Sequence, residues 1–209
     1  MLNPPAMDAL FVYAAAAEAG PLADDPRTLA LGVGKVAAAT ALTRRLLERR
    51  PAAVVAFGVA GAYRASPAVG EVCVVGSECF GDEGVATPDG FVTVGRLGLA
   101  DDAPRPADAP WIARLVDRLG NVAVVAGATV STCSGTDAIA DAVASRTGAD
   151  IETMEGAAIA HVCAELGVPW VGLRAISNRT GDRDRAGWDL ARAAAAVQDA
   201  VRLLWEEDR

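Results

Sequence analysis

Residues 151–189 read IETMEGAAIAHVCAELGVPWVGLRAISNRTGDRDRAGWD, and this stretch decides the fold. Its pattern of apolar residues predicts a short strand, a helix that stops at Gly167, and a second strand. In open α/β sheets, ligands bind at the carboxyl ends of the strands, which is where this stretch collects its polar residues. We therefore expect Glu155, Arg174 and Asn178 to converge on one small molecule.

The rest of the chain alternates short apolar runs with alanine-rich segments of helical character. The predicted strands are Leu10–Tyr13, Thr28–Leu31, Ala53–Phe57, Glu71–Val75, Val122–Val125 and Trp170–Ile176. The predicted helices are Lys35–Arg49, Pro110–Leu119, Thr136–Arg146, Gly156–Glu165 and Leu190–Glu206. Strands that alternate with helices imply a mainly parallel sheet that is covered on both faces. We expect an α/β fold: a single three-layer αβα domain over residues 1–209, with a mixed, mainly parallel central sheet flanked by helices.

Two segments fit this alternation poorly. Residues 76–110 are rich in Gly, Pro and Asp, so we expect active-site loops there, together with a hairpin around Asp89-Gly90. Residues 1–7 are expected to be a disordered lead, with Met7 a candidate for the true first residue. The apolar run that follows is short and no basic residue precedes it, which argues against a signal peptide. No run approaches the ~20 apolar residues of a membrane-spanning helix.

The composition limits the possible partners without selecting a reaction. The chain has 209 residues, of which 52% are hydrophobic and 22% charged, and its formal net charge is −8. Such a chain is globular and has enough apolar residues for one core. The negative charge argues against a nucleic-acid surface and against an anionic-membrane surface. We expect no metal site, because no C-x-x-C pair and no histidine cluster is present. Buried, reduced thiols are expected at Cys73, Cys79, Cys133 and Cys163.

The run Gly32-Val33-Gly34-Lys35 invites two phosphate-binding interpretations, and both fail. A P-loop needs glycine where Leu29 stands and serine or threonine where Val36 stands. A dinucleotide site needs an acidic residue about 20 positions further on, where the chain has Val54. We therefore expect a tight turn from a strand into a helix.

His161 is the single histidine and lies in the middle of a predicted helix, so we expect a structural role for it. Mechanisms of the Ser-His-Asp or Cys-His type then lose their base. What remains is carboxylate and amide chemistry, with Glu18 after the first strand and Glu155 at a helix start as candidates. Each also has a structural interpretation, as a solvated loop residue and as a partner of the helix dipole. Arg174 has one too, as half of a buried ion pair.

Three motifs resemble the purine nucleoside phosphorylase and nucleosidase superfamily. ETMEGAA at residues 152–158 and RAISN…GDRDR at residues 174–185 are most similar to the futalosine hydrolases, which are relatives of the methylthioadenosine/S-adenosylhomocysteine nucleosidases. GVGKVAAA at residues 32–39 is similar to the start of the first helix in the nucleosidases.

The resemblance implies a nucleoside phosphorylase-like fold and hydrolysis of the N-glycosidic bond of futalosine, which yields hypoxanthine and dehypoxanthinyl futalosine on a route to menaquinone. It also implies no cofactor, no metal, a cytoplasmic location, and a homodimer or higher homo-oligomer whose interface can complete the site.

The resemblance also assigns roles to individual residues. Glu18 corresponds to the glutamate that activates water, and Arg174 lies beside the water and the sugar, where it positions Glu18. Glu155 binds the ribose hydroxyls, which a carboxylate accepts well, and Met154 packs on the sugar. The other residues expected to contribute to the substrate site are Gly58, Val59, Phe80 and Thr132.

Asn178 is expected to decide which base is recognised. The adenine-specific relatives carry aspartate at this position, where it delivers a proton to ring nitrogen N7. An amide instead donates to a carbonyl and accepts from a protonated ring nitrogen, which suits a 6-oxopurine such as hypoxanthine. Because asparagine is a poor acid, activation of the leaving base must come from hydrogen bonding or from Asp182 in the neighbouring loop.

Phosphorolysis is the weaker alternative, because it needs a phosphate cradle of amides, basic groups and hydroxyls. The turn after the first strand is all alanine, and Val59 stands at a position that resembles one where relatives carry a hydroxyl residue. Arg174 alone is insufficient to bind a phosphate. Two further alternatives stay open: an adenine- or inosine-directed nucleosidase, and a catalytically silent nucleoside-binding protein. The expected partners are a purine nucleoside and further copies of the chain, with no nucleic acid and no membrane.

Overall fold

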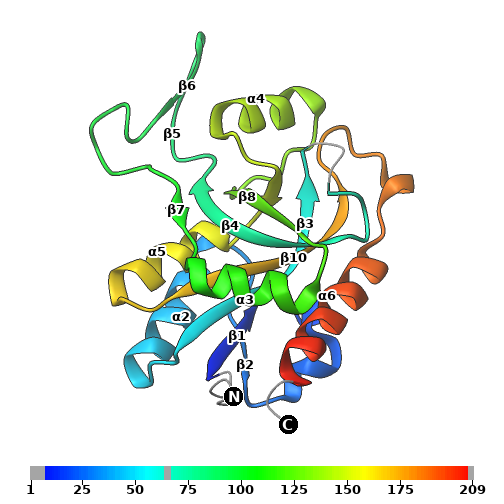
Figure 1. Ribbon diagram of the computed structural model, residues 1–209. Coiled ribbons are helices and arrows are strands. Elements are labelled where there is room, and N and C mark those ends of the chain that lie inside the picture. Colours follow the sequence, from blue (N-terminus) through cyan, green and yellow to red (C-terminus); the bar gives the residue numbers. More distant parts are fainter. Residues whose placement is uncertain (1–7, 64–66, 207–209) are drawn as a thin grey trace.

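The computed structural model describes residues 8–63 and 67–206 (Figure 1), so the expected lead at residues 1–7 lies outside the described residues. The strands are β1 (Ala9–Tyr13), β2 (Thr28–Ala30), β3 (Ala53–Ala62), β4 (Val72–Phe80), β5 (Gly84–Thr87), β6 (Gly90–Thr93), β7 (Arg105–Pro106), β8 (Ala123–Thr129), β9 (Ile151–Thr153) and β10 (Trp170–Arg179). The helices are α1 (Ala16–Ala19), α2 (Lys35–Glu48), α3 (Ala109–Leu119), α4 (Asp137–Thr147), α5 (Gly156–Leu166) and α6 (Leu190–Trp205), with 3-10 turns η1 (Gly20–Asp24) and η2 (Arg185–Gly187).

The central sheet runs in the order β10-β4-β8-β9-β3-β1-β2, with β7 paired to β4. The pairs β1–β2, β1–β3, β3–β10, β4–β8 and β8–β9 are parallel, whereas β4–β10, β3–β9 and β4–β7 are antiparallel. Because β3 pairs with both β9 and β10, the strands β3, β10, β4, β8 and β9 close into a ring. One part of the sheet is thus open and layered, and the other part is a small barrel.

Helices cover both faces of the open part of the sheet. α2 packs against α5 on one side, while α1 and α3 pack against α6 on the other (Figure 1). The main core lies between these layers and contains the fully buried side chains of Phe11, Leu42, Phe57, Leu173 and Leu204. Truncating one such leucine to alanine typically costs about 2–5 kcal/mol of stability. The expected α/β class, with helices flanking a mixed and mainly parallel sheet, is confirmed.

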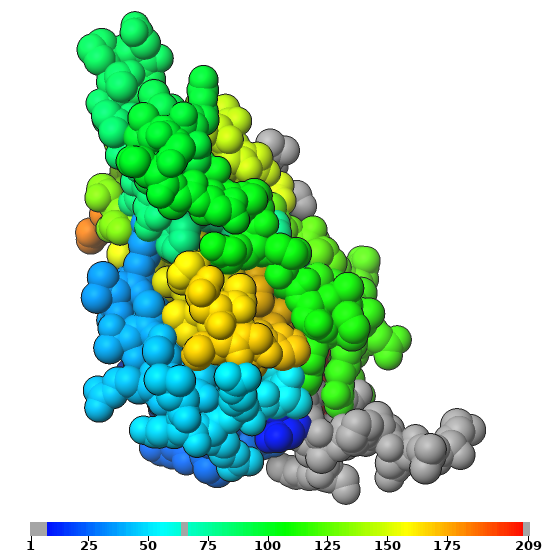
Figure 2. Space-filling view, turned by 90° about the vertical axis from the view of Figure 1, so that its left-hand side faces the viewer, coloured from blue at the N-terminus to red at the C-terminus, as the bar shows by residue number. Residues whose placement is uncertain are grey.

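Several strands extend further than the sequence predicts. β3 and β10 continue past their apolar runs through Gly58–Ala62 and Ser177–Arg179. Glycine and asparagine have low strand propensity, so these extensions depend on pairing within the barrel. The prediction of loops throughout 76–110 is wrong at its start, because β4 runs to Phe80. The hairpin around Asp89-Gly90 is confirmed as β5 and β6, which project from the body of the molecule (Figure 1, Figure 2).

The run Gly32-Val33-Gly34-Lys35 forms the expected tight turn between β2 and α2, with Gly34 as the N-cap of α2. Gly34 has a φ of 93°, a conformation that glycine adopts freely and other residues adopt only under strain. Among the residues that the structure describes, no helix is long and apolar enough to cross a membrane.

Candidate active site

A cavity of about 340 Å³ opens at the carboxyl ends of β1, β3, β9 and β10, where ligands of α/β sheets bind. Its volume lies in the range of small-molecule sites. Of the residues predicted from the sequence, Glu18, Val59, Met154, Glu155 and Asn178 line it. A second depression, of about 420 Å³, lies beside β7 and the end of α5 and contains none of the predicted residues.

Glu18 lies in the one-turn helix α1, directly after β1. Its Oε2 accepts hydrogen bonds from the backbone N–H groups of Ala14 and Ala15, at 3.1 and 2.9 Å. Its Oε1 accepts from the N–H of Val59 on β3, at 2.9 Å. A carboxylate has about four lone-pair sites, so this cradle fixes the carboxylate at the cavity wall and leaves capacity for a water molecule.

Arg174 lies on β10, 4% exposed, behind the cavity wall and opposite Gly58 in the pairing of β10 with β3. A Cβ atom at residue 58 would lie 2.3 Å from Glu18 Oε1 and 2.8 Å from Arg174 Nη1. Both side chains therefore occupy the space that the glycine leaves free. Burying a guanidinium in an apolar strand is costly without anionic partners, and the carboxylates that interact electrostatically with Arg174 are Glu78 and Glu155. Arg174 thus lies beside Glu18, on the inner side of the cavity wall.

Glu155 is the N-cap of α5 and is 8% exposed. Its Oε1 accepts the N–H of Gly34 at 2.7 Å, which ties the turn before α2 to the start of α5. Burial raises the pKa of Glu155, while the N–H of Gly34 and the charge of Arg174 oppose this shift and the charge of Glu18 adds to it. The remaining lone pairs of the carboxylate suit the two hydroxyls of a ribose, and Met154 lines the cavity beside them.

A β-bulge in β10 directs Asn178 toward the cavity. The register of β10 against β3 shifts between Ile176 and Asn178, so that Ser177 is the extra residue and Asn178 stands opposite Gly61. Bulges beside active sites commonly re-aim a side chain in this way. Asn178 Oδ1 accepts from the Ser177 hydroxyl at 2.8 Å, and Nδ2 donates to the Arg179 carbonyl at 2.9 Å. The amide keeps a second N–H and further acceptor capacity for a ligand.

Besides Gly58 and Arg174, three further predicted residues lie outside the cavity lining. Asp182 is exposed and exchanges hydrogen bonds with Asp137 at the start of α4, each backbone N–H donating to the other carboxylate at 3.1 and 3.0 Å. Asp182 therefore fastens its loop to α4. Thr132 is exposed in the loop after β8. Phe80 packs beneath Lys35, whose Nζ lies 5.1 Å from the ring centroid.

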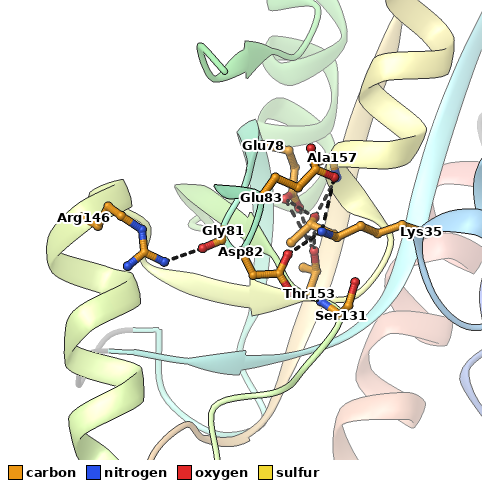
Figure 3. A network of polar contacts seen from close by, with 10 residues as sticks. Lys35, Glu78, Gly81, Asp82, Glu83, Ser131, Arg146, Thr153 and Ala157 are labelled. Carbon is orange, nitrogen blue, oxygen red and sulfur yellow. Dashed lines mark hydrogen bonds and ion pairs between the residues drawn. The ribbon is translucent and has the colours of Figure 1, made fainter. Parts of the chain in front are cut away.

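A buried carboxylate on β4 that was not predicted from the sequence, Glu78, lies in a network of polar contacts (Figure 3). The hydroxyl of Thr129 donates to Glu78 Oε2 at 2.9 Å, and the hydroxyl of Thr153 lies 3.3 Å from Oε1. Thr129 in turn accepts the N–H of Ala157 at 2.7 Å, so the network joins β4, β8 and β9 to the start of α5. Burial raises the pKa of Glu78 to about 7, against the charge of Arg174 and the hydrogen bonds of the two threonines.

Lys35 organises a second network in Figure 3. Its ammonium forms an ion pair with Asp82 and lies 3.5 Å from the carboxylate of Glu83. Asp82 also accepts the N–H of Ser131 at 2.5 Å. The lysine of the glycine-rich turn thus fastens α2 to the end of β4 and to the loop after β8.

Glu152, which was also not predicted from the sequence, lines the cavity from β9 and is 7% exposed. The Tyr63 hydroxyl lies 2.8 Å from its Oε2, and the Ser134 hydroxyl lies 2.5 Å from the same atom. Ser134 also donates its N–H to Oε1 at 3.0 Å. An acidic residue inside a short strand, two positions before Met154, was the available signal.

The remaining candidates for chemistry are the cysteines and the single histidine. Cys73, Cys79 and Cys163 are buried, as expected, whereas Cys133 is exposed and lines the cavity. His161 packs against Phe80 and does not line the cavity. Within residues 8–63 and 67–206, no cluster of His, Cys, Asp or Glu is arranged to hold a metal ion. The cavity lining offers carboxylates, the amide of Asn178, the guanidinium of Arg183 and the thiol of Cys133.

Comparison with known proteins agrees with this architecture. Residues 16–205 match the family model of the phosphorylase superfamily. The futalosine hydrolase of Thermus thermophilus is 38% identical over 185 residues, which cover 86% of this chain and 81% of that protein. The 5'-methylthioadenosine/S-adenosylhomocysteine nucleosidase of Shewanella oneidensis is 30% identical over 186 residues, covering 83% of this chain and 75% of that protein.

A solved structure supports the same fold. The MTA/SAH nucleosidase of Streptococcus pneumoniae, in complex with 8-aminoadenine, superimposes with a TM-score of 0.82 at 20% identity, covering 97% of this chain and 100% of that chain. The chain belongs to the phosphorylase superfamily, within the group that contains the futalosine hydrolases and the MTA/SAH nucleosidases.

Proposed function

We propose that the protein is a futalosine hydrolase, which cleaves the N-glycosidic bond of futalosine to give hypoxanthine and dehypoxanthinyl futalosine. The relative from Thermus thermophilus, which is 38% identical to this chain over four fifths of its own length, is named futalosine hydrolase. The structural observation that carries the proposal is the cradle of N–H groups around Glu18, because it bears directly on which nucleophile the site accepts.

Phosphorolysis needs free backbone amides or basic groups to hold a phosphate. Here the N–H groups of Ala14, Ala15 and Val59 all donate to the carboxylate of Glu18. A side-chain anion therefore fills the position that a phosphate would need, and its charge would repel one. Water has no such conflict, and a carboxylate beside it can accept its proton. This favours hydrolysis over phosphorolysis.

In the proposed mechanism, Glu155 holds the ribose hydroxyls while the C1′–N9 bond breaks through an oxocarbenium-like transition state. Glu18, oriented by Arg174 across Gly58, accepts a proton from the attacking water. Proton transfer of this kind contributes about 10²–10⁴ in rate. The remainder must come from positioning and from the negative carboxylates that face the developing positive charge on the sugar.

The departing base takes up a proton from solvent at N7, and Asn178 stabilises it by donating an N–H to the 6-oxo group and accepting from the N7–H. Asp182, the other candidate for this step, is hydrogen-bonded to Asp137 and does not line the cavity, so the mechanism does not use it. Hydrogen bonding by Asn178 then replaces a discrete acid.

Incubation with futalosine in 18O-labelled water, with and without phosphate, tests the reaction. The expected result is hypoxanthine and a sugar product that carries the label at C1′, at a rate that phosphate does not raise. Glu18→Gln should lower kcat by at least about 10² and leave ligand affinity largely intact. Glu165→Gln, an exposed glutamate on α5, is the matched control and should behave as wild type.

A panel of futalosine, inosine, adenosine and methylthioadenosine separates this function from the adenine- and inosine-directed alternatives. Methylthioadenosine cleaved as well as futalosine would contradict the proposal, and binding by calorimetry without turnover would identify a silent nucleoside-binding protein. A place in menaquinone synthesis, a cytoplasmic location and a homo-oligomer are proposed from the family resemblance alone, and gel filtration tests the last of these.

A further inference from the structure

We infer that Glu152 reads the N1–H group of the departing 6-oxopurine and so determines base specificity together with Asn178. The inference rests on the proposed hydrolysis of a hypoxanthine nucleoside and assigns a role to a residue that the mechanism above does not use. Tyr63 and Ser134 hold the carboxylate of Glu152 in place, as positioning residues.

The strand register brings the two polar side chains to opposite sides of one glycine. Asn178 on β10 pairs with Gly61 on β3, and Gly61 pairs with Glu152 on β9. Directly paired residues point to the same face of a sheet, and all three line the cavity. Neighbouring strands lie about 4.8 Å apart, so the backbones of Asn178 and Glu152 are separated by about 10 Å.

Gly61 keeps the space between them open. A Cβ atom there would lie 3.3 Å from Asn178 Nδ2 and 2.7 Å from Thr180 Cγ2, closer than an ordinary contact. With glycine, a flat ring can lie between the amide and the carboxylate with one edge toward each. The N1 edge of a purine adjoins the edge that carries O6 and N7, so a purine that places O6 and N7 toward Asn178 can turn its N1–H toward Glu152.

The surroundings of Glu152 make it an acceptor that cannot change its role. The Tyr63 hydroxyl, the Ser134 hydroxyl and the Ser134 N–H surround its two oxygens, and each can act as a donor. Oε1 has one of these contacts and Oε2 has two, so Oε1 retains capacity for another donor. Hypoxanthine offers N1–H as that donor, whereas adenine presents the lone pair of N1 and would leave a buried charge facing an acceptor.

Glu152 also resolves an ambiguity that Asn178 leaves. An amide that rotates by half a turn exchanges its donor and acceptor, so the preference of Asn178 for a 6-oxo group depends on its hydrogen bonds with Ser177 and Arg179, which hold the amide in one orientation. A carboxylate has no such alternative. The pair therefore discriminates more strongly than Asn178 alone, in the way that sites built on a fixed donor and acceptor pattern do.

Calorimetric binding of free bases tests this role without relying on turnover. The wild-type protein, Glu152→Gln and the control Glu165→Gln are each titrated with hypoxanthine, 1-methylhypoxanthine and adenine. Wild type should prefer hypoxanthine over both other bases. Glu152→Gln should reduce the hypoxanthine-to-adenine affinity ratio by at least about tenfold, the scale of one hydrogen bond to a charged group, and the control should keep the wild-type ratio.

A ratio of affinities within one protein does not depend on the folded fraction, so a merely structural role for Glu152 would leave it unchanged. An unchanged ratio in Glu152→Gln overturns the inference. Equal binding of 1-methylhypoxanthine and hypoxanthine by wild type also overturns it, even if the variant fails to fold. If wild type hydrolyses adenine nucleosides and not futalosine, the proposed function itself fails, whereas futalosine hydrolysis with an unchanged ratio removes only the role of Glu152.

Discussion

Replacing Gly58 with alanine should lower the activity strongly, because it would displace the proposed base Glu18 together with Arg174 beside it. The added Cβ would lie 2.3 Å from Glu18 Oε1 and 2.8 Å from Arg174 Nη1, whereas ordinary contacts begin at 3.4 Å. The carboxylate must therefore retreat by about 1 Å, and a misplacement of that size costs roughly 10² in rate. Glu18 cannot retreat freely, because the N–H groups of Ala14 and Ala15 fix its other oxygen.

The stability of the variant should fall as well, because overpacking a well-packed site costs about 1–3 kcal/mol. A matched control separates this loss from the loss of catalysis. In Gly172→Ala, on the same strand as Arg174, the new Cβ would lie 2.6 Å from the Cβ of Val75 in the apolar interior. This clash is similar in size and involves no group of the site.

The measurements are kcat and KM with futalosine, together with the free energy of unfolding in urea. Gly58→Ala should lose at least about 10² in kcat/KM, while Gly172→Ala should lose a comparable amount of stability and stay within about threefold of wild-type activity. If Gly58→Ala retains activity within that same threefold range, Glu18 and Arg174 do not act together across Gly58. Equal activity losses in both variants would show that destabilisation alone is responsible.

Three further predictions address the other carboxylates and the amide. Glu155→Ala should reduce transition-state binding by several kcal/mol, using about 1.5–3 for each charged hydrogen bond, whereas a role limited to the helix dipole would appear as about 0.3–1 kcal/mol of stability in a parallel unfolding experiment. Asn178→Asp should slow hypoxanthine release by setting a carboxylate against the 6-oxo group, and an unaltered substrate ranking in the nucleoside panel would contradict this. Burial raises the pKa of Glu78 from 4.5 to about 7, so between these values the folded protein keeps a proton that the unfolded chain has released, and stability falls as pH rises through this window. Glu78→Gln should remove up to about 3 kcal/mol of that pH dependence. If the free energy of unfolding changes equally between pH 5 and pH 8 in the wild type and the variant, the burial argument is refuted.

The positions of several site residues could be predicted because they follow from a local rule. Glu18, Glu155 and Asn178 each stand at the end of a strand or the start of a helix, and the strand ends of this fold meet at one cavity. The rule fails for Asp182, which also follows a strand end. Its loop turns toward α4, where Asp182 and Asp137 satisfy each other's backbone N–H groups. Local sequence carries no information about such a long-range partner.

Closure of the barrel was beyond prediction for a related reason. It depends on β3 pairing with β9 and β10 at the same time, through a segment of glycine and alanine that has low strand propensity by itself. The positions of the two acids that were not predicted, Glu78 and Glu152, also depend on this closure. Glu78 becomes buried only because β4, β8 and β9 surround it, and Glu152 faces the cavity only because β9 completes the ring. The sequence around each acid therefore does not indicate that Glu78 is buried or that Glu152 faces the cavity.

The charges near the cavity also explain how one arginine, Arg174, can serve three neighbouring carboxylates. Arg174 interacts electrostatically with Glu78 and Glu155 and lies beside Glu18 at Gly58, so three carboxylates share a single guanidinium. If all three were ionised, a poorly hydrated region would hold an excess of negative charge, which desolvation opposes. Burial raises the pKa of Glu78 to about 7, which limits this excess in the empty site, and burial also raises the pKa of Glu155. When the glycosidic bond breaks, the positive charge that develops on the ribose supplies the missing cation. Negative charge that is destabilising in the free enzyme is then compensated in the transition state. Electrostatic interactions accelerate a reaction when they are stronger in the transition state than in the ground state.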